Sequence, residues 1–476
     1  MSTKRKADDI NEGDATANAA AASADTSASK SNGNADDGND DISNNKTSSE
    51  QPIVKNHAAM MQACAAGDLA SVRALLLEAS AAEDSSNCSS GKNEEGTTNE
   101  TTTTATTNNS SSNLNQRHLL SAQQDPNSGL SPLMMASRHG QLEICKALLE
   151  AGAPWNAVDR YAKCAGDYAT ENSHWDVVNM LVEAGTQAEL ILGASIRLAK
   201  QLEESSKNNN NKDNGDQQKD ATKDATTQHQ EHDQSGKSSE SSSAIPVSHE
   251  PCTKPDYLNH ANVRYNAANT LLLDDDNDAV MMEWERPLMN AHANILTHDG
   301  TNKKRVLNIG FGLGIIDTAL QSYEPSLHVI IEAHPTVYDK MVKDGWTTKE
   351  NVRVMFGRWQ DELPKLIEEG VEFDGIFYDT YGEHFTDLED FHELMAKVLQ
   401  KPDGIYSFFN GLAPDNLFFH GVACNCVKIQ LSHLGLDSEF AQCEIQVKEE
   451  EWKGVRRKYW HGRDTYYLPI VTWKKD

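Results

Sequence analysis

Short apolar runs alternate with amphipathic segments of helix length over the C-terminal half of the chain. The strongest apolar runs cover residues 306–309, 328–332, 352–356 and 373–380. Strands that alternate with helices favour a parallel, doubly wound sheet, whose ligands bind beyond the carboxyl ends of the strands. Because Glu332, Trp359 and Asp379 lie at or just after such ends, we expect them to face one crevice.

A second pattern, nearer the N-terminus, has the period of ankyrin repeats. Residues 131–136 and 140–152 align with residues 164–169 and 174–185, and the final glycines of the two copies lie 33 positions apart. Residues 60–77 form an earlier copy that an insert interrupts, and a helix over 187–203 would close the stack. We predict a small all-α solenoid over residues 55–203. It presents a face for protein recognition or, alternatively, shields the rest of the chain.

Three polar tracts separate these patterns. Residues 1–54, about 81–114 and 204–250 are rich in Ser, Asn, Asp and Thr and have few large apolar side chains. Such segments bury too little apolar surface to offset the entropy of ordering, so we expect them to be disordered. The third tract would be a flexible linker that leaves the relative orientation of the domains open.

The apolar run at 306–309 leads into Gly310-Phe-Gly-Leu-Gly314, and Glu332 follows 22 residues after Gly310. A dinucleotide fingerprint needs a small residue at position 315, which is Ile315, and no Lys-Ser/Thr pair follows, as a Walker A loop requires. The turn instead resembles motif I of S-adenosylmethionine-dependent methyltransferases, with an acid placed to accept hydrogen bonds from ribose hydroxyls. The simpler alternative is a tight turn that binds no ligand.

Five motifs stand out in the last 220 or so residues of the chain: Val280-Met-Met-Glu-Trp-Glu-Arg-Pro-Leu-Met289, Asn308 to Leu313, Ile331-Glu-Ala-His334, Gly357-Arg-Trp-Gln360 and Phe377-Tyr-Asp-Thr-Tyr381. They resemble guanidinoacetate N-methyltransferases and, more closely, the fungal protein-arginine N-methyltransferase 2 (type IV) family, in which ankyrin-type repeats precede the catalytic domain. The resemblance implies a class I, Rossmann-like α/β methyltransferase domain over residues 251–476. It also implies S-adenosyl-L-methionine as methyl donor and S-adenosyl-L-homocysteine as product.

The same resemblance, carried over motif by motif, implies a set of cofactor contacts. They are Tyr265, Met281, Met289, Asn308, Ile309, Gly310, Phe311, Gly312, Leu313, Glu332, Ala333, His334, Trp359, Gln360 and Asp379. Residues 442–447 and 466–473 resemble the antiparallel hairpin that ends such a sheet. We expect this hairpin beside the strand at 373–380, with Pro469 at an edge position.

A guanidinium nitrogen is a poor nucleophile, because its lone pair is delocalised and the group stays protonated. Carboxylates that bind the planar group can bias its charge away from the reacting nitrogen. Glu285 and Asp379 are the predicted catalytic residues, with Asp379 as general base. Alternatively, Glu285 forms a solvated ion pair with Arg286, and Asp379 caps the following turn.

Two aromatic residues and one histidine have structural alternatives. Trp284 and Trp359 are either core residues or aromatic contacts of the cofactor. His334 is expected to be an exposed loop residue whose backbone faces the adenosine.

The resemblance also implies which nitrogen is methylated. Guanidinoacetate methyltransferases modify the internal nitrogen, so a similar site acting on protein arginine would produce N5-(δ)-methylarginine. The family further points to a large-subunit ribosomal protein as the substrate. A small-guanidine methyltransferase with an accessory repeat domain and a catalytically silent scaffold remain as alternatives.

Composition adds little to this interpretation. The chain has 43 basic and 72 acidic residues, a net charge of −29, and no dense basic patch, so nucleic-acid binding is not expected. An acidic enzyme suits a cationic, arginine-bearing protein substrate. Eight scattered cysteines without a CxxC pair indicate no metal site and a reducing compartment. We expect no signal peptide and no membrane span, localisation to cytoplasm and nucleus, and a monomer that contacts proteins through its repeats.

Overall fold

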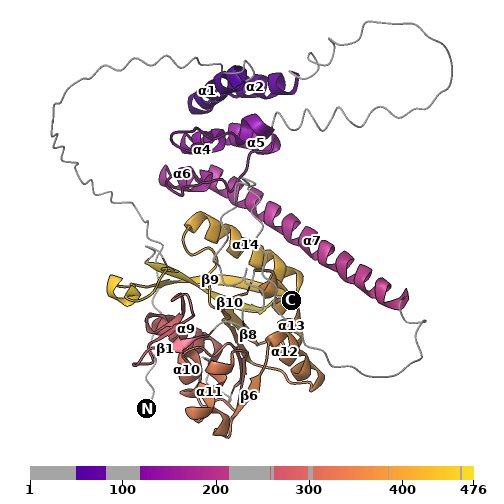
Figure 1. Ribbon diagram of the computed structural model, residues 1–476, viewed down its shortest axis with the longest axis vertical. Helices are drawn as coiled ribbons and strands as arrows, with labels where there is room; N and C mark the ends of the chain where they lie inside the picture. The colour runs from indigo at the N-terminus through magenta and orange to yellow at the C-terminus, as the bar shows by residue number, and fades with distance from the viewer. Residues whose placement is uncertain are drawn as a thin grey trace, which may run out of the picture. The chain divides into compact units, whose positions relative to one another are not determined.

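The computed structural model describes residues 50–81, 118–213, 258, 262–297, 304–383, 385–460 and 464–475. Most of the residues predicted to be disordered lie outside these ranges. Residues Pro52–Asp476 form one compact unit, which contains both the helical repeats and the α/β domain (Figure 1).

The described part of the predicted all-α solenoid contains three helix pairs. They are α1 (Glu50–Ala66) with α2 (Leu69–Ala81), α4 (Pro132–Arg138) with α5 (Leu142–Glu150), and α6 (Ala165–Glu171) with α7 (Trp175–Asp213). The Ser131 hydroxyl caps α4 by accepting a hydrogen bond from Met134 N at 3.2 Å, and Pro132 occupies the first turn, where no N–H is needed. Leu133, Ile144 and Leu148 are buried between successive pairs.

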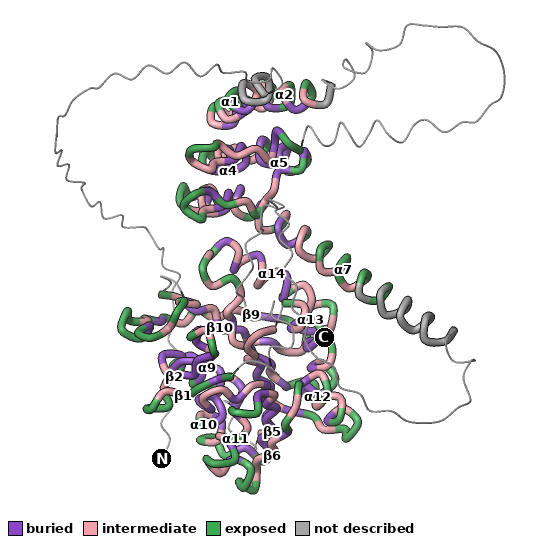
Figure 2. The backbone as a smooth tube through the Cα atoms, viewed as in Figure 1, coloured by how far each residue is buried: buried purple, intermediate pink, exposed green. Residues whose placement is uncertain are grey.

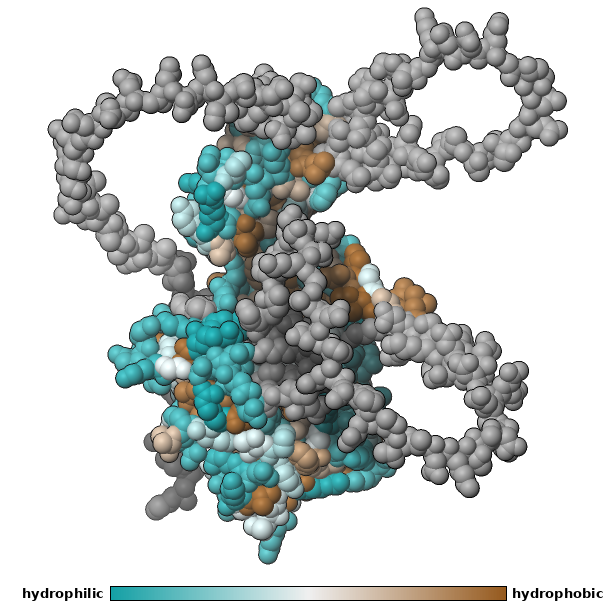
Figure 3. Space-filling view, in the orientation of Figure 1, coloured by the Kyte–Doolittle hydropathy of each residue, from teal (hydrophilic) through white to brown (hydrophobic). Residues whose placement is uncertain are grey.

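Helix α7 is longer than the sequence pattern predicted. A closing helix over 187–203 was expected, but that segment is part of α7, which runs unbroken for 39 residues and into the predicted linker. Gly185 does not end the helix, because it lies where Trp155 packs against α7: a Cβ there would be 2.8 Å from the indole ring. Apolar side chains of α7, including Ile191 and Leu192, remain exposed (Figure 3). No described helix is long and apolar enough to cross a lipid bilayer.

The α/β domain contains a seven-stranded sheet in the order β6-β5-β4-β7-β8-β10-β9. The strands are β4 (Arg305–Ile309), β5 (Leu327–Glu332), β6 (Val352–Phe356), β7 (Gly375–Tyr378), β8 (Ile405–Phe408), β9 (Leu436–Glu444) and β10 (Thr465–Trp473). The first five in the sheet order are parallel, whereas β10 is antiparallel to both β8 and β9. This topology confirms the predicted Rossmann-like class with a terminal antiparallel hairpin.

Helices cover both faces of this sheet. On one face lie α9 (Arg286–Thr297), α10 (Ile315–Gln321) and α11 (Pro335–Lys343); on the other lie α12 (Trp359–Glu368), α13 (Phe385–Val398) and α14 (Leu417–His433). Successive residues of a strand point to opposite faces, so Val306 joins the core under α9 and α10 while Leu307 joins the core under α12 and α13. The central strands are therefore buried almost throughout (Figure 2).

The hairpin does not lie where the sequence reasoning placed it. Strand β8 separates it from β7, so the predicted contact with the strand at 373–380 is wrong. Pro469 is also not at an edge: it lies in β10, opposite Phe440 of β9, and β9 is the edge strand. Proline is tolerated there because β8 pairs with β10 only at Val471 and Thr472, and the Ser407 hydroxyl donates to Pro469 O at 2.5 Å.

A separate three-stranded antiparallel sheet was not predicted. It comprises β1 (Arg264–Tyr265), β2 (Leu271–Leu273) and β3 (Ala279–Met282). Strands of two to four residues leave too short a pattern to recognise in a sequence. This sheet matters because β3 runs directly into the 3₁₀ turn η2 (Glu283–Glu285), which carries one of the two candidate acids.

The solenoid ends against the α/β domain. Phe418, Val422 and Cys426, all on α14, are buried in the same apolar cluster as the repeat helices. The relative orientation that the linker left open is thus defined by contacts between α14 and the helices α6 and α7. Burial of a side chain such as Phe418 contributes roughly 1.5–3 kcal/mol.

Candidate active site

The glycine-rich turn between β4 and α10 packs closely against two neighbouring segments. Gly310, Gly312 and Gly314 have φ angles of +91°, +52° and +68°, which favour glycine. A Cβ on Gly310 would lie 1.9 Å from the carbonyl oxygen of Asp379, and a Cβ on Gly312 would lie 2.6 Å from Met281 Sδ. The turn therefore needs glycine both for its conformation and for space.

Glu332, at the end of β5, holds this turn in place. Its Oε2 accepts a hydrogen bond from Phe311 N at 2.8 Å, and its Oε1 accepts one from His334 N at 2.7 Å. Burial raises the pKa of Glu332, and these backbone N–H groups oppose the rise. Each carboxylate oxygen keeps a further lone pair, which suits it to accept a ribose hydroxyl as predicted.

A cavity of about 730 Å³ opens beside the turn, a size suited to a nucleoside ligand. The predicted cofactor residues that line it are Met281, Ile309, Gly310, Phe311, Gly312, Glu332, Ala333, His334, Trp359, Gln360 and Asp379. Gln360 Oε1 is buried and has no hydrogen-bond partner among the described residues, so it is available to accept from a ligand amino group. The glycine cradle and this unused acceptor both fit an adenosine-type group.

Four predicted cofactor contacts lie behind the cavity wall instead of lining it. Tyr265 donates through its hydroxyl to Gly312 O at 2.9 Å, and the side-chain amide of Asn308 donates to Gly310 O at 2.8 Å. Leu313 N donates to Met281 Sδ at 3.2 Å, while Met289, on α9, is fully buried in the apolar cluster that also contains Phe311. These residues support the turn, which explains why they accompany the motifs without touching the cavity.

Two other predictions concerned exposure and packing. His334 is buried, with 7% of its surface exposed, so the expectation of an exposed loop residue is wrong. Pro335 starts α11, which makes His334 its N-cap: the ring Nδ1 accepts from Thr336 N at 3.2 Å. Trp284 is a core residue, packed among Trp452, Tyr459 and Trp460.

Trp359 fits both of its interpretations. It lines the cavity and also packs edge-on against Phe391 and Tyr378 in the core.

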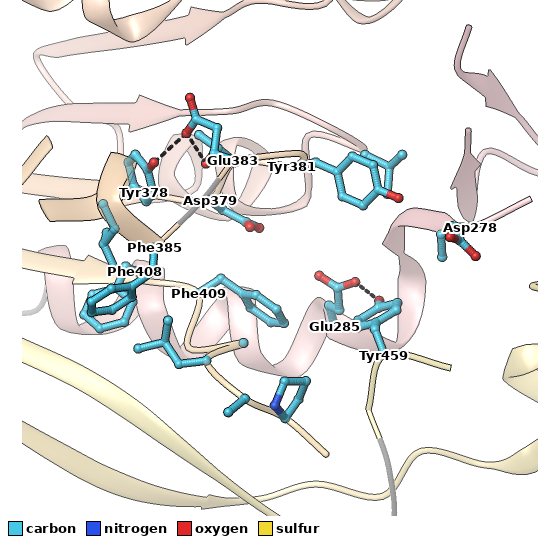
Figure 4. Close-up of a pocket in the computed structure, with 18 of the residues that line it drawn as sticks. Asp278, Glu285, Tyr378, Asp379, Tyr381, Glu383, Phe385, Phe408, Phe409 and Tyr459 are labelled. Carbon is cyan, nitrogen blue, oxygen red and sulfur yellow. Dashed lines mark hydrogen bonds between the residues drawn. The ribbon is translucent and has the colours of Figure 1, made fainter. Parts of the chain in front are cut away.

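A second cavity, of about 370 Å³, adjoins the first and contains both candidate acids (Figure 4). Glu285 enters it from η2, and Asp379 enters it from the end of β7. Asp379 lines both cavities, and so do Thr380 and Tyr381 just after it. A ligand in the smaller cavity is thereby placed next to one in the larger.

The structure does not support a solvated ion pair for Glu285 or a turn cap for Asp379. Glu285 has only 3% of its surface exposed, accepts from Met282 N at 3.0 Å, and accepts a short hydrogen bond from the Tyr459 hydroxyl. Arg286 pairs with Glu283 instead, so Glu285 is not a solvated ion-pair partner. The Asp379 carboxylate points into the smaller cavity and not toward the turn after it (Figure 4).

Both acids have raised pKa values in the ligand-free protein. Burial raises the pKa of Glu285 to about 8, and the nearby Asp379 carboxylate adds to the rise. Burial alone raises the pKa of Asp379 to about 7. A cation that enters the cavity relieves this desolvation, so the pocket is suited to bind a flat, positively charged group between the two acids.

Sequence reasoning missed Glu383, in the loop after β7. Its carboxylate accepts hydrogen bonds from four neighbours: Trp359 Nε1 at 2.9 Å, Gln360 Nε2 at 3.0 Å, the Tyr378 hydroxyl at 2.6 Å and Thr380 Oγ1 at 2.7 Å. It lines both cavities and ties their shared wall together. A loop acid has no periodic signal, and only its place just after Phe377-Tyr-Asp-Thr-Tyr381 suggested a role. Tyr459 was missed for the same reason.

Comparison with known families identifies both parts of the chain. The family model described as guanidinoacetate N-methyltransferase matches residues 245–446, and the model for three copies of the ankyrin repeat matches residues 104–191. The first match contains Glu285, Asp379 and the glycine turn.

Several curated proteins are similar over more of the chain. A protein arginine N-methyltransferase 2 from Candida glabrata is 35% identical over 70% of this chain and 78% of its own length. A protein of the same name from Saccharomyces cerevisiae is 32% identical over 74% of this chain and 85% of its own. One from Yarrowia lipolytica is 43% identical, but the match covers 46% of this chain and 47% of that protein.

Solved structures are more distant. Spermidine synthase from Thermotoga maritima is 14% identical with a TM-score of 0.33, over 45% of this chain and 69% of that one. An O-methyltransferase from Bacillus cereus in complex with S-adenosylhomocysteine is 16% identical with a TM-score of 0.30, over 40% and 81% of the two chains.

The close approach at Gly310 predicts that no side chain fits at this position. Gly310→Ala places a methyl group against the Asp379 carbonyl, whereas Gly370 also has a positive φ, +68°, but a Cβ there has nothing within 4 Å. We expect Gly370→Ala to lower the free energy of unfolding by about 1–2 kcal/mol, the cost of a left-handed backbone. Gly310→Ala should cost more and abolish binding of labelled S-adenosylmethionine. Urea unfolding and equilibrium dialysis measure both, and equal effects of the two variants would contradict the close contact.

The two buried acids generate a prediction about pH. A raised folded pKa means that the folded ligand-free protein keeps protons that the unfolded chain has released, so stability falls as pH rises from about 6.5 to 8. Glu285→Gln keeps the acceptor oxygen but cannot titrate. Over this window its free energy of unfolding should therefore fall by about 1–2 kcal/mol less than that of the wild type. Measurements above pH 6.5 avoid the opposite effect of His292 and His392, whose pKa values burial lowers to about 3.

Glu369→Gln is the matched control for this experiment. Glu369 is an exposed carboxylate whose pKa is lowered by its hydrogen bond with Arg353, so it is ionised throughout the window. Urea midpoints at pH 6.5 and 8.0 should show the wild-type pH dependence in this variant. A Glu285→Gln protein with that same dependence would show that Glu285 does not titrate in the window.

Proposed function

The chain belongs to the protein arginine N-methyltransferase 2 family, and we propose that it methylates the internal (N5, δ) nitrogen of an arginine in a protein substrate. It is an S-adenosylmethionine-dependent arginine methyltransferase. The finer proposal concerns which nitrogen and which substrate.

The observation that carries the proposal is the pair of buried acids beside the cofactor cleft. Glu285 and Asp379 reach one cavity from different elements, and that cavity shares a wall with the nucleoside-sized cleft. Two carboxylates on either side of a planar cation match the fork of a guanidinium. The burial that raises their pKa values is offset when such a cation arrives, which favours this ligand over a neutral one.

The residues of the site divide the chemical work. Glu285, held by Met282 N and the Tyr459 hydroxyl, orients the guanidinium and attracts its charge toward the nitrogens that do not react. When bound in the cleft, S-adenosylmethionine supplies a methyl group whose bond to sulfur breaks as its bond to nitrogen forms, and the sulfur keeps the electron pair. Asp379 lies at the junction of the two cavities and accepts the proton that the methylated nitrogen releases. The pKa of about 7 belongs to the ligand-free site; a bound guanidinium favours the ionised carboxylate, which is the form that accepts a proton.

Two considerations support the internal nitrogen and a protein substrate. The match to the guanidinoacetate N-methyltransferase family covers both acids, and the resemblance seen in the sequence implies transfer to the nitrogen bonded to the carbon chain. The repeats, which match an ankyrin family, supply a surface for protein contacts. A large-subunit ribosomal protein as the substrate, a monomeric state, and localisation to cytoplasm and nucleus remain predictions.

A small guanidino compound is the second candidate substrate, because the matching family model is named for guanidinoacetate. One experiment separates the two. The purified protein is incubated with labelled S-adenosylmethionine and either free guanidinoacetate or an extract of cells that lack the enzyme. We expect label in an extract protein, with fragment masses in mass spectrometry that place the methyl group on N5. Label on terminal nitrogens, or in guanidinoacetate alone, would overturn the proposal.

Asp379→Asn tests the assignment of the general base. The amide keeps the shape of the side chain but removes the charge and the proton acceptor, so we expect turnover to fall about 10²–10³-fold. Binding of S-adenosylmethionine, measured by equilibrium dialysis, should change far less. Asp403→Asn, at an exposed turn outside both cavities, is the control and should keep full activity. Unchanged turnover in Asp379→Asn would remove Asp379 from the mechanism.

A further inference from the structure

We propose that the ankyrin repeats hold one wall of the arginine pocket in its binding conformation, with Asp167 and Gly166 of α6 as positioning residues. The inference rests on the proposed function of the smaller cavity. It gives the repeats a direct part in substrate binding, through the N-terminus of α14.

The wall in question is the segment between β8 and α14. Gly411, Leu412, Ala413 and Pro414 line the smaller cavity, which also contains Glu285 and Asp379 (Figure 4). Ala413 has a φ of +43°, in the left-handed region that a residue with a Cβ seldom adopts. A conformation of this kind persists only where its surroundings impose it. Something outside the segment must therefore hold it.

Asn416, the N-cap of α14, connects the wall to the repeats. Its Oδ1 accepts from Phe419 N at 2.9 Å, and its own backbone N donates to Ala413 O at 3.3 Å. Its Nδ2 donates to Asp167 Oδ2 at 2.7 Å. The same Asp167 oxygen accepts from Cys164 N at 2.8 Å and so caps α6. One carboxylate thus joins the start of a repeat helix to the start of the helix that follows the pocket wall.

Apolar packing makes this junction tight. Phe418 is buried among the repeat residues and lies directly against Gly166: a Cβ on that glycine would be 2.0 Å from the ring. Trp155, from the loop between α5 and α6, contacts both Phe418 and Phe419, with ring centroids 6.3 and 5.7 Å away. The position of α14 is consequently defined by the repeats as well as by its own sheet.

The segment is therefore held at both ends by different parts of the molecule. Its start continues from the end of β8, where Phe408 and the following Phe409 also line the cavity, and its end is fixed on α6. The cofactor cleft shares none of the residues 411–414. Loosening the junction should therefore weaken binding of the arginine substrate and leave the binding of S-adenosylmethionine intact.

A change at Asn416 tests this directly. Asp167 Oδ2 accepts from both Cys164 N and Asn416 Nδ2, so Asp167→Asn keeps both bonds through its amide oxygen and is the matched control. In Asn416→Asp the new carboxylate still accepts from Phe419 N, but an oxygen replaces the NH₂ and faces the Asp167 carboxylate. We expect KM for the arginine substrate to rise roughly threefold to tenfold in this variant, the effect of one lost hydrogen bond. Adding Asp167→Asn removes one of the two like charges, so KM should fall back toward the wild-type value in the double variant.

Two glycines provide a second, independent pair. Gly166→Ala forces α6 and α14 apart, whereas Gly421→Ala, on α14 itself, has nothing within 4 Å of its Cβ. Gly166→Ala should raise KM with little change in the binding of S-adenosylmethionine. Gly421→Ala should behave as the wild type.

The outcomes are distinguishable from a failure of the proposed function. A wild-type protein that methylates no arginine contradicts the proposed function. A wild type that is active, with KM unchanged in Asn416→Asp and Gly166→Ala, overturns the present inference alone. A fall in kcat at constant KM, parallel to a lower melting temperature, also overturns it, because that is the effect of a merely structural contact. Raised KM with rescue by the double variant supports it.

Discussion

The contact between the glycine turn and the end of β7 is the constraint on which the site depends. Strands β4 and β7 pair in parallel, Asp379 N donates to Ile309 O at 3.0 Å, and Gly310 leaves no room for a side chain beside the Asp379 carbonyl. The residue that ends one strand is thereby pressed against the turn that ends the other. A methyl donor on the turn and a methyl acceptor beside the acid are brought together by backbone geometry alone, before any side chain contributes.

A second feature of the site is the burial of two like charges. Glu285 and Asp379 reach the same cavity, and neither has a cationic side chain among its hydrogen-bond partners in the described part of the chain. Such an arrangement is unfavourable for the empty protein, because two carboxylates cannot both be ionised cheaply in a desolvated site. It becomes favourable when cations enter. The ligand-free protein is less stable as a result, and the site favours a positively charged substrate over a neutral one.

The parts of the fold with strong periodic or local signals were predictable from sequence. The strands at 306–309, 328–332 and 373–380, the glycine turn after the first and the acids at the ends of the other two could be identified because buried parallel strands are continuously apolar. The short strands β1 to β3, the loop acid Glu383 and the position of Pro469 could not, since each depends on which segments become neighbours in space. Gly185 shows the limit clearly: a glycine at the end of a repeat resembles a helix stop, yet here it makes room for Trp155.

The burial of Phe418, Val422 and Cys426 against the repeats also determines how the repeat stack ends. A stack of helical repeats normally ends in a unit with a polar outer surface, which keeps the last apolar face out of water. Here the enzyme domain supplies that terminal unit through α14. Truncation between the two domains would expose a complementary apolar surface on each fragment. Each domain therefore depends on the other for solubility, and this junction is a poor place to separate them.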